Sequence, residues 1–138
     1  MVRVTAGRLH AVFTHRLAPS AVPANAGIRQ MVVDQLRAWG VAPSVVEEVA
    51  LTTHELVANA LVHGEAPVDL RLVHTGSQLV VEVHDRSTER PVPRVVDVNE
   101  EHGRGLQIVE ALTAAWGVRI GPEDKTVWAS HLLAPVEA

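Results

Sequence analysis

SVVEEVALTTHELVANALVHG, residues 44–64, is the stretch that decides the fold. Its apolar residues recur at helical spacing, which predicts a long amphipathic helix ending at Gly64. Ser44 with Glu47 three residues later has the spacing of a capping box at its start. The core face is predicted to carry Val46, Val49, Thr53, Leu56, Val57 and Ala60. The opposite face is a polar stripe, formed by Glu48, Thr52, Glu55, Asn59 and His63.

Two members of this stripe, Glu55 and Asn59, are one helical turn apart and point the same way. A carboxylate that can take a proton and a carboxamide oxygen that can bind Mg²⁺ are groups that phosphoryl transfer needs side by side. Taken alone, such a stripe is more often a solvated helix face. The rest of the chain therefore has to decide between the two interpretations.

The composition sets limits on the class of protein. The 138 residues fit one domain spanning 1–138, and the chain contains no cysteine for a disulfide or a cysteine-based zinc site. We see no signal-peptide pattern and no stretch long enough to span a membrane, so a cytoplasmic protein is expected. The net charge is -4 and aromatic residues make up 3%, which makes nucleic acid an improbable direct partner.

Around the long helix, hydrophobic periodicity and turn residues predict the remaining elements. These are strands at 9–17, 68–73, 79–85, 118–120 and 125–133, and helices at 24–39 and from 103 to Trp116 with Gly117 as the cap. Thr75 to Gln78 is predicted to be a hairpin turn, and residues 86–102 a long irregular connection. This order predicts an α/β (α+β) two-layer sandwich, in which a mostly antiparallel mixed sheet carries the helices on one face.

Asp85 stands out in the strand at 79–85. Leu79, Val81 and Val83 share one face of that strand, and Asp85 continues the same face. A carboxylate on a buried face is costly unless something pairs with it, so Asp85 is a candidate ligand contact.

Gly103-Arg104-Gly105 precedes the third predicted helix. Glycines let the backbone approach a phosphate, and the free N–H groups and dipole of a helix N-terminus attract the anion. The motif lacks the third glycine of a dinucleotide fingerprint and the Lys-Ser/Thr pair of a Walker loop. Lys125-Thr126 lies at the start of the last strand. With the Glu55–Asn59 segment, the Asp85 segment and the Gly103–Gly105 segment, it makes four pieces of sequence that could converge in one site.

Together the four pieces resemble the Bergerat-type (GHKL) ATPases, and within them the stand-alone anti-sigma-factor serine/threonine kinases of bacteria. The likeness runs from about Leu17 to Leu132. The matching segments are Glu55-Leu-Val-Ala-Asn59-Ala-Leu-Val-His63-Gly64, Val81-Glu-Val-His-Asp85-Arg86-Ser87, Gly103-Arg-Gly105-Leu-Gln-Ile-Val and Lys125-Thr126-Val-Trp.

The resemblance implies ATP and Mg²⁺ as cofactors and a role for each matched residue. Asn59 would bind the Mg²⁺ that bridges the phosphates, and Glu55 would be the catalytic base. Asp85 would accept a hydrogen bond from the adenine amino group, and Thr126 would support the adenine. The phosphates would be wrapped by Gly103, Arg104, Gly105 and Leu106, and the helix end would be shaped by His63 and Gly64.

The resemblance also implies partners. Such proteins hold a sigma factor, or phosphorylate a serine of a STAS-domain anti-sigma antagonist, and so regulate transcription; a homodimer is expected. The alternative is a non-catalytic regulator of the same fold that binds ATP weakly or not at all. It is motivated by Arg86 and Ser87, because the family usually continues Asp-x-Gly-x-Gly after the aspartate. A sensor histidine kinase or a gyrase-type ATPase fits poorly, since we find neither a phospho-acceptor helix nor a transducer domain.

Two residue types have ordinary interpretations. The eight histidines show no metal-ligand spacing, so most are expected at the surface or at strand edges. Core packing is the expectation for Trp39, Trp116 and Trp128.

Overall fold

The computed structural model of the chain describes residues 11–17, 25–88 and 104–133. Within them, strands and helices follow one another in the order that the sequence predicts. The elements are β1 (Ala11–Arg16), α1 (Asn25–Ala38), α2 (Pro43–His63), β2 (Asp69–His74), β3 (Gln78–Asp85), α3 (Arg104–Leu112), β4 (Ala115–Ile120) and β5 (Lys125–Leu132). Most of the predicted connection at 86–102 lies outside the described residues.

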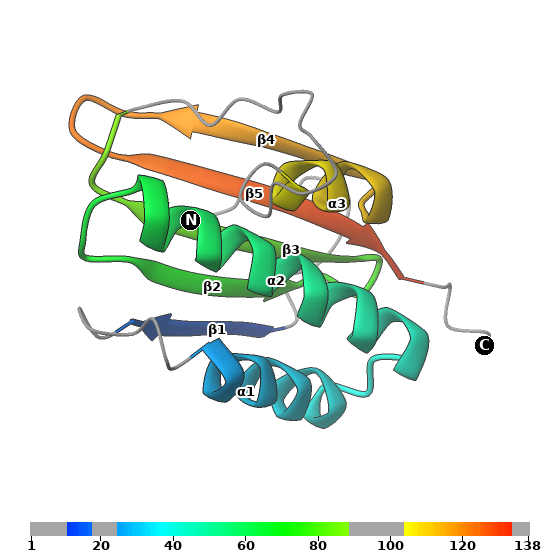
Figure 1. Cartoon of the computed structure of the whole chain (residues 1–138). Coiled ribbons are helices and arrows are strands. Elements are labelled where there is room, and N and C mark those ends of the chain that lie inside the picture. Colours follow the sequence, from blue (N-terminus) through cyan, green and yellow to red (C-terminus); the bar gives the residue numbers. More distant parts are fainter. Residues whose placement is uncertain (1–10, 18–24, 89–103, 134–138) are drawn as a thin grey trace.

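The described elements form two layers (Figure 1). The sheet has the strand order β1-β2-β3-β5-β4, and all three helices lie on one of its faces with α2 between α1 and α3. The predicted α+β sandwich is therefore confirmed. Every neighbouring pair of described strands is antiparallel, so the sheet is not mixed over these residues.

The core fills the space between the two layers. Leu79, Val81 and Val83 of β3 point into it and are at most 1% exposed. Leu56 and Val57 pack onto it from α2 and are equally buried. The helix-facing side chains thus follow the period of two on the strands and of 3.6 on the helix that the sequence predicts.

The ends of α1 and α2 are fixed by the backbone. After α1 the chain reverses at Gly40 (φ +75°), where Gly40 N–H donates to Arg37 O and Val41 N–H to Leu36 O, both at 3.0 Å. This is a Schellman motif, and its positive φ favours glycine. The prediction that Ser44 and Glu47 form a capping box is wrong, because α2 begins at Pro43 and Ala42 is the N-cap without a side-chain hydrogen bond.

The prediction that the third helix reaches Trp116 is also wrong. α3 ends at Leu112, and Trp116 and Gly117 lie in β4, paired with Ala129 and Trp128 of β5. Trp116 still packs against the core, as predicted. Its spacing suits a helix, but Trp116 pairs with β5 in the β4–β5 hairpin, and this pairing is a constraint that helical periodicity does not report. The prediction of core packing is wrong for Trp128, which alternates with the core-facing residues of β5 and lies on the helix-free face.

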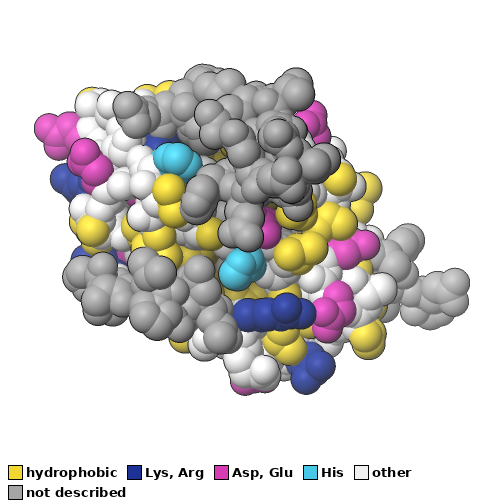
Figure 2. Space-filling model, in the orientation of Figure 1, with side chains coloured by type: hydrophobic (Ala, Val, Ile, Leu, Met, Phe, Trp, Pro, Cys, Tyr) yellow, Lys and Arg dark blue, Asp and Glu magenta, His cyan; other side chains and the backbone are white. Residues whose placement is uncertain are grey.

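On the helix-bearing side, acidic and basic side chains lie intermixed over α1 and the adjoining part of α2 (Figure 2). One such pair joins the two helices, with Arg29 Nη2 3.1 Å from Glu47 Oε2. Among the helices described, not one combines the length and the apolar character needed to cross a bilayer.

His131 differs from the expectation for most histidines. It lies on the helix-facing side of β5 opposite Leu79, is 2% exposed, and neither ring nitrogen has a hydrogen bond among the described residues. Burial lowers the pKa of His131 from 6.5 to about 4, because the charged imidazolium is poorly solvated there.

A folded pKa below the unfolded value means that stability is lost as the pH falls from about 6.5 to about 4. We expect the free energy of unfolding to drop by up to roughly 3 kcal/mol over this range because of His131. His131→Leu should remove that part of the slope in urea unfolding measured at several pH values. Identical slopes in the two proteins would contradict the assignment.

Candidate functional site

The polar stripe of α2 is not a uniformly solvated face. Glu55 and Asn59 are half-buried, whereas Glu48 and His63 near the helix ends are exposed. Thr52, in the middle of the stripe, is fully buried, and its hydroxyl makes no hydrogen bond among the described residues. The stripe therefore places a carboxylate and a carboxamide one turn apart at a partly covered position.

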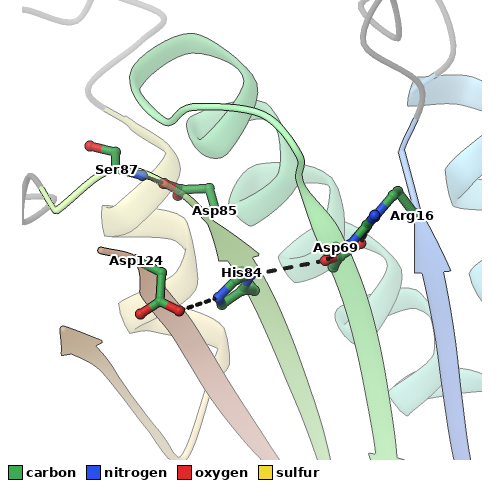
Figure 3. Close-up of polar contacts among 6 residues, drawn as sticks. All are labelled: Arg16, Asp69, His84, Asp85, Ser87 and Asp124. Carbon is green, nitrogen blue, oxygen red and sulfur yellow. Dashed lines mark hydrogen bonds and ion pairs between the residues drawn. The ribbon is translucent and has the colours of Figure 1, made fainter. Parts of the chain in front are cut away.

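Asp85 ends β3 on the same side of the sheet as α2 and is completely buried. Its Oδ1 accepts a hydrogen bond from the backbone N–H of Ser87 at 2.7 Å (Figure 3). Its Oδ2 has no hydrogen-bond partner among the described residues, and Lys125 Nζ lies 3.6 Å away. A buried carboxylate oxygen without a donor is unfavourable, so the site is suited to a ligand that supplies an N–H group.

The Asp-Arg-Ser segment has a defined local structure. The hydrogen bond from Ser87 N–H to the Asp85 side chain forms an Asx-type turn. The next contact is Arg86 N–H to Glu65 O at 2.9 Å, which joins the end of β3 to the chain that follows α2. Two hydrogen bonds from backbone N–H groups thus hold the Asp85-Arg86-Ser87 segment, which lacks the two glycines usual in the family.

Gly64 brings α2 and β3 close together. It follows the last turn of α2, and its N–H donates to Ala60 O at 2.8 Å. A Cβ at this position would lie 2.5 Å from that oxygen and 2.7 Å from the Asp85 carboxyl group. Since φ is -91°, the close approach and not the backbone conformation requires glycine here. The predicted role of Gly64 at the helix end thus has a physical basis.

The third piece of the predicted site is the glycine-containing segment at the start of α3. α3 packs against α2 and begins at Arg104 and Gly105, while Gly103 lies outside the described residues. Leu106 in its first turn is buried in the core at 6% exposure. The start of α3 is thus a helix N-terminus, a kind of place where anions bind, and α3 is held against the helix that carries Glu55 and Asn59.

The fourth piece is Lys125-Thr126, whose two side chains lie on opposite faces of the sheet. Lys125 pairs in register with Asp85 and is 2% exposed on the helix-facing side. Thr126 pairs with His84 and points to the opposite face, so the structure does not bring the Thr126 side chain together with Asp85. The resemblance gave Thr126 a role and Lys125 none, although the alternation of Lys125 with Val127 and Ala129 puts Lys125 on the core face.

The helix-free face behind Asp85 carries a row of polar contacts that includes one Arg–Asp ion pair. Arg16 Nε lies 2.8 Å from Asp69 Oδ1, and His84 lies between Asp69 (4.0 Å) and Asp124 (3.0 Å) (Figure 3). The hydrogen bond from Arg16 lowers the pKa of Asp69. Thr126 lines a pocket of about 480 Å³ on this face, together with residues that include Arg16, Asp69 and His84.

Comparison with known proteins agrees with this geometry. A sequence model described as the histidine kinase-like ATPase domain matches residues 18–131, and no curated protein matches the chain. The crystal structure of the RsbU and RsbW domains of Rv1364c from Mycobacterium tuberculosis is similar, with a TM-score of 0.68 at 20% identity. The match covers 92% of this chain and 34% of that one, so this chain spans about a third of the length of its structural neighbour.

The chain belongs to the histidine kinase-like ATPase domain family. The resemblance inferred from the four sequence segments is thereby confirmed, and family membership implies an ATP-binding domain.

The contact of Gly64 with Asp85 is testable. We expect Gly64→Ala to lower the free energy of unfolding by about 1–3 kcal/mol, because its Cβ would push against the Ala60 carbonyl and the Asp85 carboxylate. The matched control is Gly27→Ala in α1, where a Cβ would meet nothing within 4 Å. That control should be neutral or stabilising by up to about 1 kcal/mol. Equal effects of both variants in urea unfolding would contradict the packing argument.

Proposed function

We propose that this protein is an ATP-dependent serine/threonine kinase of the anti-sigma-factor type. The observation that carries the proposal is that Glu55 and Asn59 lie one turn apart on α2 and are both half-buried. The same helix ends at Gly64, beside the buried Asp85. A base, a metal ligand and a nucleobase acceptor on adjoining elements are the groups that nucleotide-dependent phosphoryl transfer requires.

The base end of the site fits adenine. Asp85 Oδ2 is buried without a hydrogen bond among the described residues, and the exocyclic amino group of adenine is a donor of the kind it lacks. Oδ1 is already held by Ser87 N–H, so the carboxylate is oriented before a ligand binds. This preorganisation reduces the entropy that binding costs.

The phosphate end would be formed by the start of α3. The backbone N–H groups of Gly103, Arg104, Gly105 and Leu106 would face the phosphates, helped by the positive end of the helix dipole. Asn59 would hold Mg²⁺ through its side-chain oxygen, which is a hard ligand suited to this ion. Bound Mg-ATP would supply the phosphoryl group and the charge neutralisation for its transfer.

Glu55 would act on the phosphate acceptor. Its carboxylate would take the proton from a serine hydroxyl of the partner protein as the oxygen attacks. Half-burial and the position one turn before Asn59 support this role, because the base must lie beside the metal-bound phosphate. The proposed acceptor is a STAS-domain anti-sigma antagonist, and the proposed regulatory target is a sigma factor. This choice of partners follows from the resemblance of the four sequence segments to the anti-sigma-factor kinases.

The nucleotide site is tested by Asn59→Ala in calorimetric titration with Mg-ATP. Loss of a ligand to a charged group should weaken binding by about 10- to 100-fold. The control is Gln35→Ala, which shortens a half-buried carboxamide on α1 and should leave binding unchanged. Equal affinity of wild type and Asn59→Ala would contradict the role of Asn59. No heat from the wild type at millimolar Mg-ATP would favour the non-catalytic regulator instead.

The base is tested by Glu55→Gln in a phosphorylation assay with a STAS-domain antagonist. We expect the transfer rate to fall by about 10²- to 10⁴-fold, with Mg-ATP affinity changed little. Glu48→Gln, on the same helix face two turns earlier and exposed, should transfer phosphate at the wild-type rate. Retained transfer by Glu55→Gln would exclude Glu55 as the base.

A further inference from the structure

Asp85 is a fully buried carboxylate with a buried cation beside it. Asp85 is 0% exposed and Lys125 is 2% exposed. The Lys125 ammonium lies 3.6 Å from Asp85 Oδ2, because the two residues are register partners on β5 and β3. An ionised carboxylate is costly to bury without a counter-ion, and a cation at this distance lowers that cost by Coulomb attraction.

The other charged groups near this end of β3 do not face the Asp85 carboxylate. The elements packed against β3 are α2, β2 and β5, and α2 reaches Asp85 through Gly64, which has no side chain. Among the described residues, Lys125 is therefore the ionic partner of Asp85. The remaining charged or titratable residues nearby are His63, Glu65 and Arg86, which are exposed, Asp69, His84 and Asp124, which contact one another on the helix-free face, and Glu55, about two and a half helical turns before Gly64.

The two oxygens of the Asp85 carboxylate have different surroundings. Oδ1 accepts the backbone N–H of Ser87 at 2.7 Å, whereas Oδ2 accepts no hydrogen bond among the described residues. The Lys125 ammonium at 3.6 Å is beyond the range of about 2.7–3.2 Å for an N–H···O hydrogen bond, so the cation attracts the charge without occupying Oδ2. A proton on this carboxyl group would reside on Oδ2, because Oδ1 already serves as an acceptor. Protonation would thus turn the acceptor available to a ligand into a donor.

We propose that Lys125 is a positioning residue that keeps Asp85 ionised, and thereby keeps Oδ2 an acceptor for the amino group of the nucleobase. The proposal rests on the proposed nucleotide site, since it takes the 6-amino group of adenine as the donor to Oδ2. Lys125 acts through Asp85, so this role requires no contact between Lys125 and the nucleotide. Without the cation, the buried carboxyl group would take up a proton near neutral pH, and its O–H would then oppose the N–H of adenine.

The test compares ATP with purine riboside triphosphate, which lacks the 6-amino group and is otherwise the same molecule. Calorimetric titration of the full chain with each Mg-nucleotide, from about pH 6 to about pH 9, gives the ratio of the two dissociation constants. Wild type should bind ATP about 10- to 100-fold more tightly, with a ratio that is constant over this range. Protonation of the phosphates affects both nucleotides alike and cancels in the ratio.

Lys125→Met should lower this ratio to about 1–3 at about pH 6, because the protonated Asp85 makes no hydrogen bond to the amino group. The ratio should rise toward the wild-type value at about pH 9, where even an unpaired buried carboxyl group ionises. Lys125→Arg keeps the cation and should keep the wild-type ratio at every pH. The control, Arg29→Met, removes a positive charge from an exposed ion pair on α1 and should change nothing.

Lys125→Met removes the counter-ion of a buried group, so thermal melting by circular dichroism must show that the variant is folded. General damage to the site would weaken both nucleotides together and would not make their ratio depend on pH. If Lys125→Met does not fold, the wild-type profile and Lys125→Arg decide the question.

Four outcomes would overturn the inference. Two are found in variants: a folded Lys125→Met with the wild-type ratio at every pH, or a folded Lys125→Arg whose ratio depends on pH. The others need only the wild type: a ratio that falls toward about 1 between about pH 9 and about pH 6, or equal affinities for both nucleotides throughout. In all four cases ATP still binds and the proposed function stands. Absence of binding by either nucleotide would instead overturn the proposed site and this inference together.

Discussion

Burial of the Asp85 carboxylate is the constraint on which the rest of the site depends. A buried carboxylate needs compensation, and two groups supply it: the Ser87 N–H after β3 and the Lys125 ammonium on β5. Gly64 after α2 leaves room for the carboxyl group, because a Cβ there would lie 2.7 Å from it. The compensation is incomplete because Oδ2 lacks a hydrogen bond among the described residues, and native proteins reserve such unsatisfied groups for function.

The long helix α2 connects this constraint to the core. One side of it buries Leu56 and Val57 against the sheet, and the other presents Glu55 and Asn59 at half-exposed positions. The hydrophobic side holds the helix rigidly, so the polar side is positioned to within a side-chain rotamer. A functional pair on a packed helix is better ordered than the same pair on a loop would be.

The two faces of the sheet carry different kinds of side chains. Apart from His131, the helix-facing residues of β3 and β5 are apolar up to the end where Asp85 and Lys125 lie. The other face carries the Arg16–Asp69 ion pair, and His84 lies beside Asp69 across the strands. Because side chains alternate along a strand, neighbouring residues of β3 and β5 serve opposite faces. Thr126 and Lys125 are separated in this way although they are adjacent in sequence.

The sequence by itself determined the order of the elements, the core faces and the candidate residues Glu55, Asn59 and Asp85, because helical and strand periodicities and the four family segments are local patterns. Tertiary structure decided what these local patterns do not contain. Trp116 lies in a strand because it pairs with β5. Ser44 is not the N-cap because α2 starts at Pro43. The contact of Lys125 with Asp85 likewise follows from strand register, since only pairing of β3 with β5 brings together residues 40 positions apart.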